Sequence, residues 1–124
     1  MTHDEFDATF RKMIPPGTVF QNPGGGVSEV LSNKDGKVSY RRGSSTISVS
    51  TKSLFDAFAS FRGKRMSSAD LKSRWPSIFD SSARPAGHSC NATFLFLALA
   101  KMGIASGITG SGVRGNPFLV EVRE

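Results

Sequence analysis

The chain has 124 residues, 38% hydrophobic and 21% charged, which is typical of one small folded domain and excludes a disordered chain. Its longest apolar run, residues 94–100, is too short to cross a bilayer, and the polar start MTHDEFDATF is unlike a signal peptide. One cysteine excludes an intrachain disulfide, and with only two histidines it argues against a structural zinc site. We therefore expect a single-domain cytoplasmic protein with no cofactor, no metal and no membrane contact.

The net charge of +6 is unevenly distributed along the chain. Residues 1–35 carry three basic and five acidic side chains, whereas residues 36–118 carry twelve basic and three acidic ones. A segment with a net charge of +9 attracts polyanions, and phosphate backbones are the commonest polyanions in a cytoplasm. Charge alone does not distinguish a nucleic-acid-binding surface from a basic surface that only aids solubility.

The first predicted element is a short helix over residues 1–13. Phe6, Phe10 and Met13 recur at helical spacing and would share one face, and the prolines at 15 and 16 would end the helix. The stretch Asn-Pro-Gly-Gly-Gly that follows at 22–26 predicts a loop.

Residues 27–50 predict a three-stranded antiparallel meander with one apolar face. Val38 and Tyr40 alternate with polar residues in one strand, and Ile47 and Val49 do so in another. Turn residues separate the runs. The expected strands cover residues 27–31, 37–41 and 46–50, with turns at 33–36 and 42–45.

Two predicted helices follow the meander. Thr51 is suited to cap the first, which carries an apolar stripe that includes Leu54, Phe58 and Phe61 and would end at Gly63. The second covers residues 68–75: the segment Ser-Ser-Ala-Asp at 67–70 has the pattern of a capping box, and Pro76 disfavours continuation.

A third predicted helix covers residues 89–102, with Gly103 suited to its end. Its centre, FLFLALA, is apolar on nearly every side, so we expect a buried helix whose first turn alone can meet a ligand. A glycine-rich turn over 110–116 and an alternating strand with Phe118, Val120 and Val122 complete the chain.

Three helices followed by a glycine-rich hairpin resemble the winged-helix superfamily, over about residues 51–123. The likeness rests on the segment 94–122, an apolar helix followed by KMGIASGITGSGVRGNPFLVEV. It implies an α+β fold in which a β-meander (17–50), preceded by an N-terminal arm (1–16), packs on a winged-helix-like three-helix unit (51–124) with a C-terminal β-hairpin. Winged helices mostly bind DNA through the third helix and the hairpin, and some serve as protein-interaction modules.

The basic segments and this resemblance together predict a non-enzymatic nucleic-acid-binding protein, with duplex DNA as the favoured partner. Phosphate contacts are expected from basic side chains of the meander, the helices and their loops: Arg41, Arg42, Arg62, Lys64, Arg65, Lys72, Arg74, Arg84 and Arg114. At the start of the third helix stand the polar residues His88, Ser89, Asn91 and Thr93. The last three are expected nearest to base edges, where asparagine can pair with adenine.

Two short motifs suggest other chemistry. Residues 110–115 fit G-x-G-x-x-G, but a strand rather than a helix is predicted after them, so a tight hairpin turn with Arg114 at its tip is favoured over a dinucleotide site. Asp35-Gly-Lys37 spells the D-x-K fragment of metal-dependent nucleases, for which Glu29 would have to supply a second carboxylate. A turn role for Asp35 is favoured.

Two alternative functions stay open. A small basic protein could act as a protein-interaction module, such as a phage or accessory inhibitor that blocks a partner. Alternatively Cys90, at a helix start near His88, could be the nucleophile of a hydrolase. Residues two apart do not face each other on a helix, so a small buried cysteine beside a capping Ser89 or Asn91 is the favoured interpretation.

Overall fold

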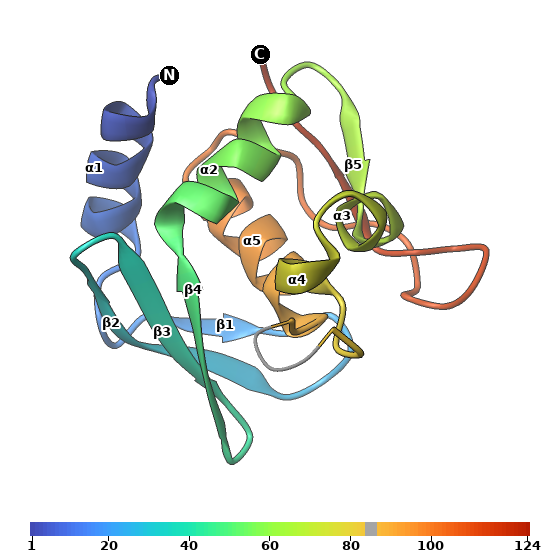
Figure 1. Ribbon diagram of the computed structural model, residues 1–124, viewed down its shortest axis with the longest axis horizontal. Helices are drawn as coiled ribbons and strands as arrows, with labels where there is room; N and C mark the ends of the chain where they lie inside the picture. Colours follow the sequence, from blue (N-terminus) through green and yellow to red (C-terminus); the bar gives the residue numbers. More distant parts are fainter. Residues whose placement is uncertain (84–86) are drawn as a thin grey trace. The chain divides into compact units, whose positions relative to one another are not determined.

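Two units, residues 1–59 and 60–124, make up the chain in the computed structural model, which describes residues 1–83 and 87–124. The fold is α+β (Figure 1). The N-terminal unit contains α1 (His3–Met13), β1 (Val19–Gln21), β2 (Val27–Lys34), β3 (Lys37–Arg42), β4 (Ser45–Ser50) and most of α2 (Thr51–Ser60). The C-terminal unit contains β5 (Arg65–Ser67), α3 (Ser68–Arg74), α4 (Pro76–Phe79), α5 (Cys90–Lys101) and β6 (Leu119–Glu121).

Helix α1 confirms the helix predicted at the N-terminus. A reciprocal capping box fixes its start, because Thr2 Oγ1 accepts from the Glu5 N–H and Glu5 Oε1 accepts from the Thr2 N–H. Phe6 and Phe10 are fully buried, as their spacing predicted. Met13 was wrongly placed in the apolar face: the helix ends there, Met13 is 36% exposed, and Ile14 turns inward instead.

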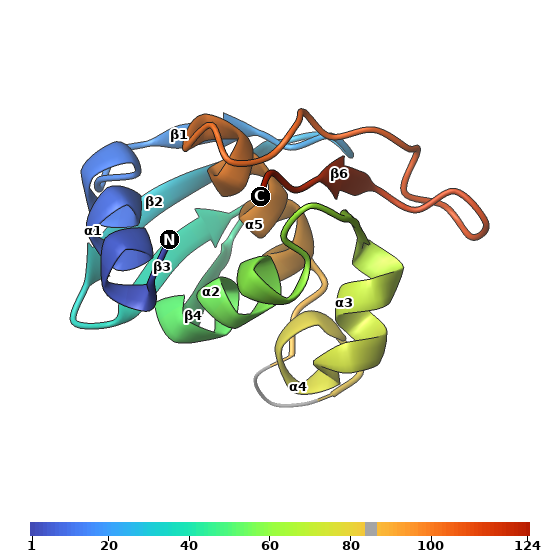
Figure 2. The same cartoon turned by 90° about the horizontal axis from the view of Figure 1, so that it is seen from above.

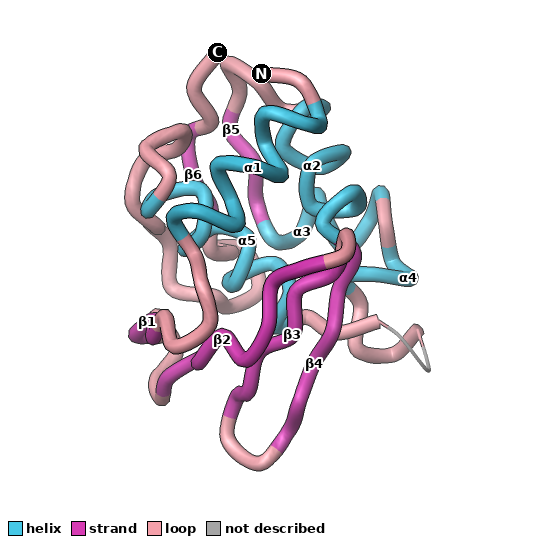
Figure 3. The backbone as a smooth tube through the Cα atoms, turned by 90° about the vertical axis from the view of Figure 1, so that its left-hand side faces the viewer, coloured by secondary structure: helices cyan, strands magenta, loops and turns pink. Residues whose placement is uncertain are grey.

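The N-terminal sheet has four antiparallel strands in the order β1-β2-β3-β4, so the expected three-stranded meander was one strand short (Figure 3). Three residues of β1 are too few to show alternation in the sequence. A bulge between Val30 and Ser32 turns Asn33 toward the interior and extends β2 to Lys34. The Asn33 amide then donates to the carbonyl oxygens of Phe10 and Ile14, at 3.4 and 2.9 Å, and ties the end of α1 to the sheet.

The β2–β3 hairpin closes through a two-residue turn at Asp35 and Gly36. Their φ angles of 56° and 75° are those of a type I′ turn, which suits the twist of an antiparallel hairpin. Glu29 pairs with Arg41 at the opposite end of the hairpin from Asp35. Asp35 therefore has the turn role that was favoured, and the hairpin does not bring Glu29 to it.

Helix α2 begins at Thr51 itself, so Thr51 is not the cap. The hydroxyl of Ser50 instead accepts from the Ser53 N–H at 3.4 Å. The apolar stripe is confirmed for Leu54 and Phe58, which are buried, and Phe58 contacts Phe6 of α1 with ring centroids 5.6 Å apart.

In the C-terminal unit the capping box of α3 is confirmed. Ser67 Oγ accepts from the Asp70 N–H and Asp70 Oδ2 accepts from the Ser67 N–H, both at 3.0 Å. The helix ends at Arg74, but Pro76 opens a further helix, α4, so the segment from α2 to α5 holds four helices rather than the expected three. Four residues make a helix too short to show a period in the sequence.

The predicted C-terminal hairpin is confirmed in part, because the last strand meets segment 104–109 but also pairs with β5, which was not expected. Strand β6 pairs with β5, with Met66 opposite Val120. The returning segment 104–109 reaches it only through isolated bridges, Ala105 with Val122 and Thr109 with Leu119. Figure 2 shows the loop between these segments extending beyond β6, on the side of α3. Within residues 1–83 and 87–124, none of the helices has the length and apolarity that a membrane span requires.

Candidate nucleic-acid interface

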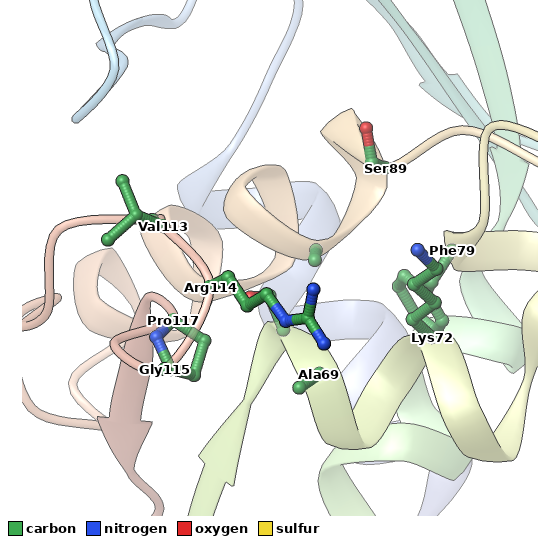
Figure 4. Close-up of a pocket in the computed structure, with 11 residues that line it drawn as sticks. Ala69, Lys72, Phe79, Ser89, Val113, Arg114, Gly115 and Pro117 are labelled. Carbon is green, nitrogen blue, oxygen red and sulfur yellow. The ribbon is translucent and has the colours of Figure 1, made fainter.

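The C-terminal unit contains a cleft of about 550 Å³, referred to below as the C-terminal cleft. Three elements form it: one side of α3, the start of α5 and the loop 112–117 (Figure 4). Its lining residues are Ser68, Ala69, Lys72, Phe79, Ser89, Ala92, Gly112, Val113, Arg114, Gly115 and Pro117. Among these described residues none is acidic, so the two cations, Lys72 and Arg114, give the cleft a positive potential.

Helix α3 contributes one face to the cleft. Ser68 and Lys72 are four residues apart and therefore share that face, and Ala69 lies beside them. Figure 4 shows the guanidinium of Arg114 reaching from the loop across Ala69 toward the side of α3 that carries Lys72. Lys72 and Arg114 are both solvent-exposed, so an anion can reach them from outside.

The loop around Arg114 has a fixed shape that does not depend on a ligand. The N–H groups of Ser111, Gly112 and Val113 all donate to the Asn116 carbonyl, at 3.2, 3.0 and 3.3 Å. The Asn116 N–H donates back to the Val113 carbonyl and closes a four-residue turn with Arg114 at its tip. Because these N–H groups are used internally and β6 follows, the glycine pattern forms the predicted hairpin turn rather than a phosphate cradle.

The start of α5 does not offer the base-reading residues that were expected. Asn91 and Thr93 are only 1% and 9% exposed, so placing them at base edges was wrong. The Asn91 amide donates to the Ile78 carbonyl at 2.9 Å, and Thr93 Oγ1 donates to the Cys90 carbonyl at 3.1 Å. The Ile78 carbonyl also accepts the His88 N–H, so Asn91 joins α5 to α4. Ser89 alone of the three is exposed and lines the cleft.

Two of the basic residues that were predicted to contact phosphate form ion pairs with carboxylates. Arg41 pairs with Glu29 across the β2–β3 hairpin, and Arg65 Nε lies 3.0 Å from Glu121 Oε1 across β5–β6. All four side chains are largely exposed, so each pair is weak and each carboxylate competes with a phosphate for its arginine.

Arg74 lies over an aromatic surface rather than in the cleft. Its guanidinium carbon is 5.2 Å from the Phe61 ring centroid and 4.7 Å from that of Trp75. Trp75 in turn makes an edge contact with Phe79, which lines the cleft, at 6.5 Å between centroids. The single tryptophan of the chain therefore does not line the cleft itself but contacts Phe79, which does.

The other predicted contacts within the described residues do not line the C-terminal cleft. Arg42 lies with Arg41 in a second cleft, in the N-terminal unit, of about 530 Å³, referred to below as the N-terminal cleft. Lys64 is exposed, and Arg62 and His88 are half-buried. Arg84 lies outside the described residues. Of the predicted basic residues, the structure brings Lys72 and Arg114 together in one cleft and Arg41 and Arg42 in another.

Cys90 is the first residue of α5 and is half-buried. The capping part of the favoured interpretation was wrong, because neither Ser89 nor Asn91 caps the helix with its side chain. The Ser89 hydroxyl accepts instead from Ser81 Oγ at 2.9 Å. Within residues 1–83 and 87–124, no group of three or more histidine, cysteine or acidic side chains is arranged to hold a metal.

One carboxylate near the cleft is held ionised by its neighbours. Hydrogen bonds from the main-chain N–H and the hydroxyl of Ser82, at 2.9 and 2.8 Å, lower the pKa of Asp80. The positive charge of Lys72 lowers the pKa of this carboxyl further.

The sequence pattern missed the uncharged part of the cleft. Ser68, Ala69, Phe79 and Pro117 line it, yet they were not singled out. The i, i+4 spacing of Ser68 and Lys72 on the predicted helix was the one available signal. Comparison of the chain with protein-family models, curated proteins and solved structures finds no match.

Proposed function

We propose that this protein is a non-enzymatic nucleic-acid-binding protein, with duplex DNA as the favoured partner, and that the C-terminal cleft is its phosphate-binding site. The observation that carries the proposal is the meeting of Lys72 and Arg114, from α3 and from the distant loop, in a cleft whose described lining holds no carboxylate. Ser68 and Ser89 add hydroxyls to the same cleft, and short hydroxyl side chains commonly contact phosphate oxygens.

The distribution of charge between the two units also favours the C-terminal unit as the part that binds phosphate. The C-terminal unit carries nine basic and four acidic residues, a net charge of +5, whereas the N-terminal unit has seven and six, a net +1. The excess positive charge of the chain therefore belongs almost entirely to the unit that contains the cleft. A field of this sign raises the local concentration of a polyanion and steers its approach.

The winged-helix resemblance fits this proposal as well. The chain order α2, β5, α3, α4, α5 and β6, with β5 and the segment 104–109 both meeting the last strand, is the order expected for a winged helix with one extra short helix. In that interpretation the loop with Arg114 is the wing. Because Asn91 and Thr93 are buried, α3 and the wing make most of the contacts, and the start of α5 contributes only Ser89.

The salt dependence of binding tests the proposal. If about six phosphate contacts form, the logarithm of the affinity for a random labelled duplex should fall with the logarithm of the salt concentration at a slope of about −5. Replacing the two cleft cations (Lys72→Ala with Arg114→Ala) should weaken binding at least about ten-fold and make the slope less negative by about 2.

A matched control variant removes the same amount of positive charge at positions outside the cleft. Lys101 and Arg123 are exposed and do not line it, so Lys101→Ala with Arg123→Ala removes two charges from the same unit. This control should lose only a few-fold in affinity. A wild-type slope near zero, or equal losses in the two double variants, would refute the proposal.

A further inference from the structure

The C-terminal cleft has more apolar wall than phosphate binding requires. Ala69, Val113 and Pro117 supply accessible carbon surface, whereas the cations and hydroxyls come from four other residues. Phe79 and Ala92 also line the cleft, but each is only 2% exposed. Phosphate recognition needs positive charge and hydrogen-bond donors, and an apolar wall adds nothing to it. The volume of about 550 Å³ lies within the range of roughly 300–1,000 Å³ that pockets for small organic groups have.

We infer that the C-terminal cleft accepts one unpaired nucleotide of a nucleic-acid strand, with the base against the apolar wall and the adjacent phosphate between Lys72 and Arg114. This inference rests on the proposed function. A base inside an intact duplex is stacked and paired and cannot turn its faces to an apolar wall, so the occupant is a bulged, extruded or single-stranded nucleotide.

The arrangement of the side chains suits a ligand that has one flat apolar part and one negatively charged part. Figure 4 shows the guanidinium of Arg114 over Ala69, with Val113 and Pro117 on the loop side and Phe79 on the side of Lys72. A carboxylate of a protein partner would satisfy the cations but leave the apolar surface uncovered. A nucleotide covers both, and burial of that surface adds favourable free energy.

A set of matched probes tests the inference. Fluorescence anisotropy would compare a labelled paired duplex, the same duplex with one bulged nucleotide, and the single strand, all at one salt concentration. We expect the bulged duplex to bind at least about ten-fold more tightly than the paired duplex, because it avoids the cost of unpairing and unstacking a base. It should also bind more tightly than the single strand, because its paired arms keep the duplex backbone that the proposed function favours.

A cleft-filling variant separates base binding from phosphate binding. Ala69→Phe places a large side chain on the exposed α3 residue that lines the cleft, whereas Ser73→Phe does so on an exposed α3 residue that does not. Ala69→Phe should abolish the preference for unpaired probes over the paired duplex, because its ring fills the space that the base would occupy. Ser73→Phe should keep the preference.

The possible results distinguish this inference from the proposed function. Equal affinity for the three probes, or a preference that survives Ala69→Phe, overturns the inference and leaves the proposed function standing. Failure of the wild-type protein to bind any of the probes overturns both.

Free nucleoside monophosphates complete the test, with Trp75 fluorescence as the readout because its ring contacts Phe79 in the cleft wall. A monophosphate that binds as tightly as the single strand identifies a small-molecule site and overturns the inference. Binding at least about a hundred-fold weaker than the strand, abolished by Ala69→Phe, supports it.

Discussion

The two clefts of this protein contain the same number of cations but differ in what surrounds them. The N-terminal cleft holds Arg41 and Arg42 together with Glu29, and Arg41 is paired with that carboxylate. The C-terminal cleft holds Lys72 and Arg114 with hydroxyls and apolar side chains, and no carboxylate lies among its described lining residues. Gly25, Gly26 and Gly43 line the N-terminal cleft with open space around them. Of the two glycines that line the C-terminal cleft, Gly112 lies against the Phe118 ring and Gly115 faces open space.

This difference shows why counting basic residues does not locate an anion site. A carboxylate beside an arginine lowers the local potential and competes for the same donors, so a basic pair in the sequence can be nearly neutral in the fold. A site needs cations whose hydrogen-bond donors are not engaged by a carboxylate, held by elements that cannot easily rearrange. The following changes test each part of this distinction.

The largest effect is expected from the enclosed glycine at the start of the loop 110–116. Gly110 has φ +89°, and a Cβ added there would overlap the carbonyl oxygen of Pro117, whereas Gly43 at φ +61° faces open space. Gly110→Ala should therefore destabilise the protein by about 3 kcal/mol or more in urea unfolding, through backbone strain and overlap together. Gly43→Ala should cost only about 1 kcal/mol, and equal costs would show that the loop 110–116 is not rigidly held.

A carboxylate introduced into the C-terminal cleft should have the next largest effect. Ala69→Glu gives this cleft the feature that Glu29 gives the other, within reach of the two cations. Affinity for a labelled duplex should fall at least about ten-fold at moderate salt. Ala69→Gln has nearly the same size and no charge, and it should bind within about three-fold of the wild type; a similar loss in both variants would implicate size rather than charge.

Removing the carboxylate from the N-terminal cleft should have a smaller, opposite effect. Glu29→Gln frees Arg41 from its ion pair, and we expect the affinity for DNA to rise by about two- to three-fold. Asp35→Asn changes the net charge equally and keeps a residue that tolerates the positive φ of the turn. A gain of the same size in both variants would show that net charge alone is responsible.

The smallest effect concerns Asp80 beside the C-terminal cleft. Its pKa is lowered in the folded protein from the ordinary value of 3.8, so its ionised form stabilises the fold above that pH. This contribution is lost as the pH falls below 3.8 and the carboxyl becomes protonated. Asp80→Asn should unfold at a slightly lower temperature than the wild type at pH 7, and the difference should vanish in acid; a difference that persists there would contradict this assignment.

The sequence predicted those elements that span at least one full period of their pattern. Phe6 and Phe10 indicated α1, Ile47 and Val49 indicated β4, and the pairing of Ser67 with Asp70 indicated the start of α3. The missed elements, β1, β5 and α4, have three, three and four residues. Elements of that length are set by tertiary contacts, which a local pattern does not contain.

The site was predictable only where it depends on residue type. Lys72 and Arg114 were expected as exposed cations, but the pairing of Arg41 with Glu29 was hidden by the bulge in β2. A turn at Asp35 and Gly36 without a bulge would place Val30 opposite Arg41, and the bulge shifts the register by one residue to Glu29. Asn91 was misplaced for a related reason, since its partner, the Ile78 carbonyl, belongs to the unpredicted helix α4.

The convergence of three main-chain N–H groups on the Asn116 carbonyl has a consequence for the dynamics of the free protein. Amide hydrogens at Ser111, Gly112 and Val113 are engaged before any ligand arrives, so their exchange with solvent deuterium should be retarded even in an otherwise exposed loop. The arginine at the tip is then presented on a backbone that is already ordered. Association at this point would restrict side-chain rotation but little of the main chain, which keeps the entropic penalty of complex formation small.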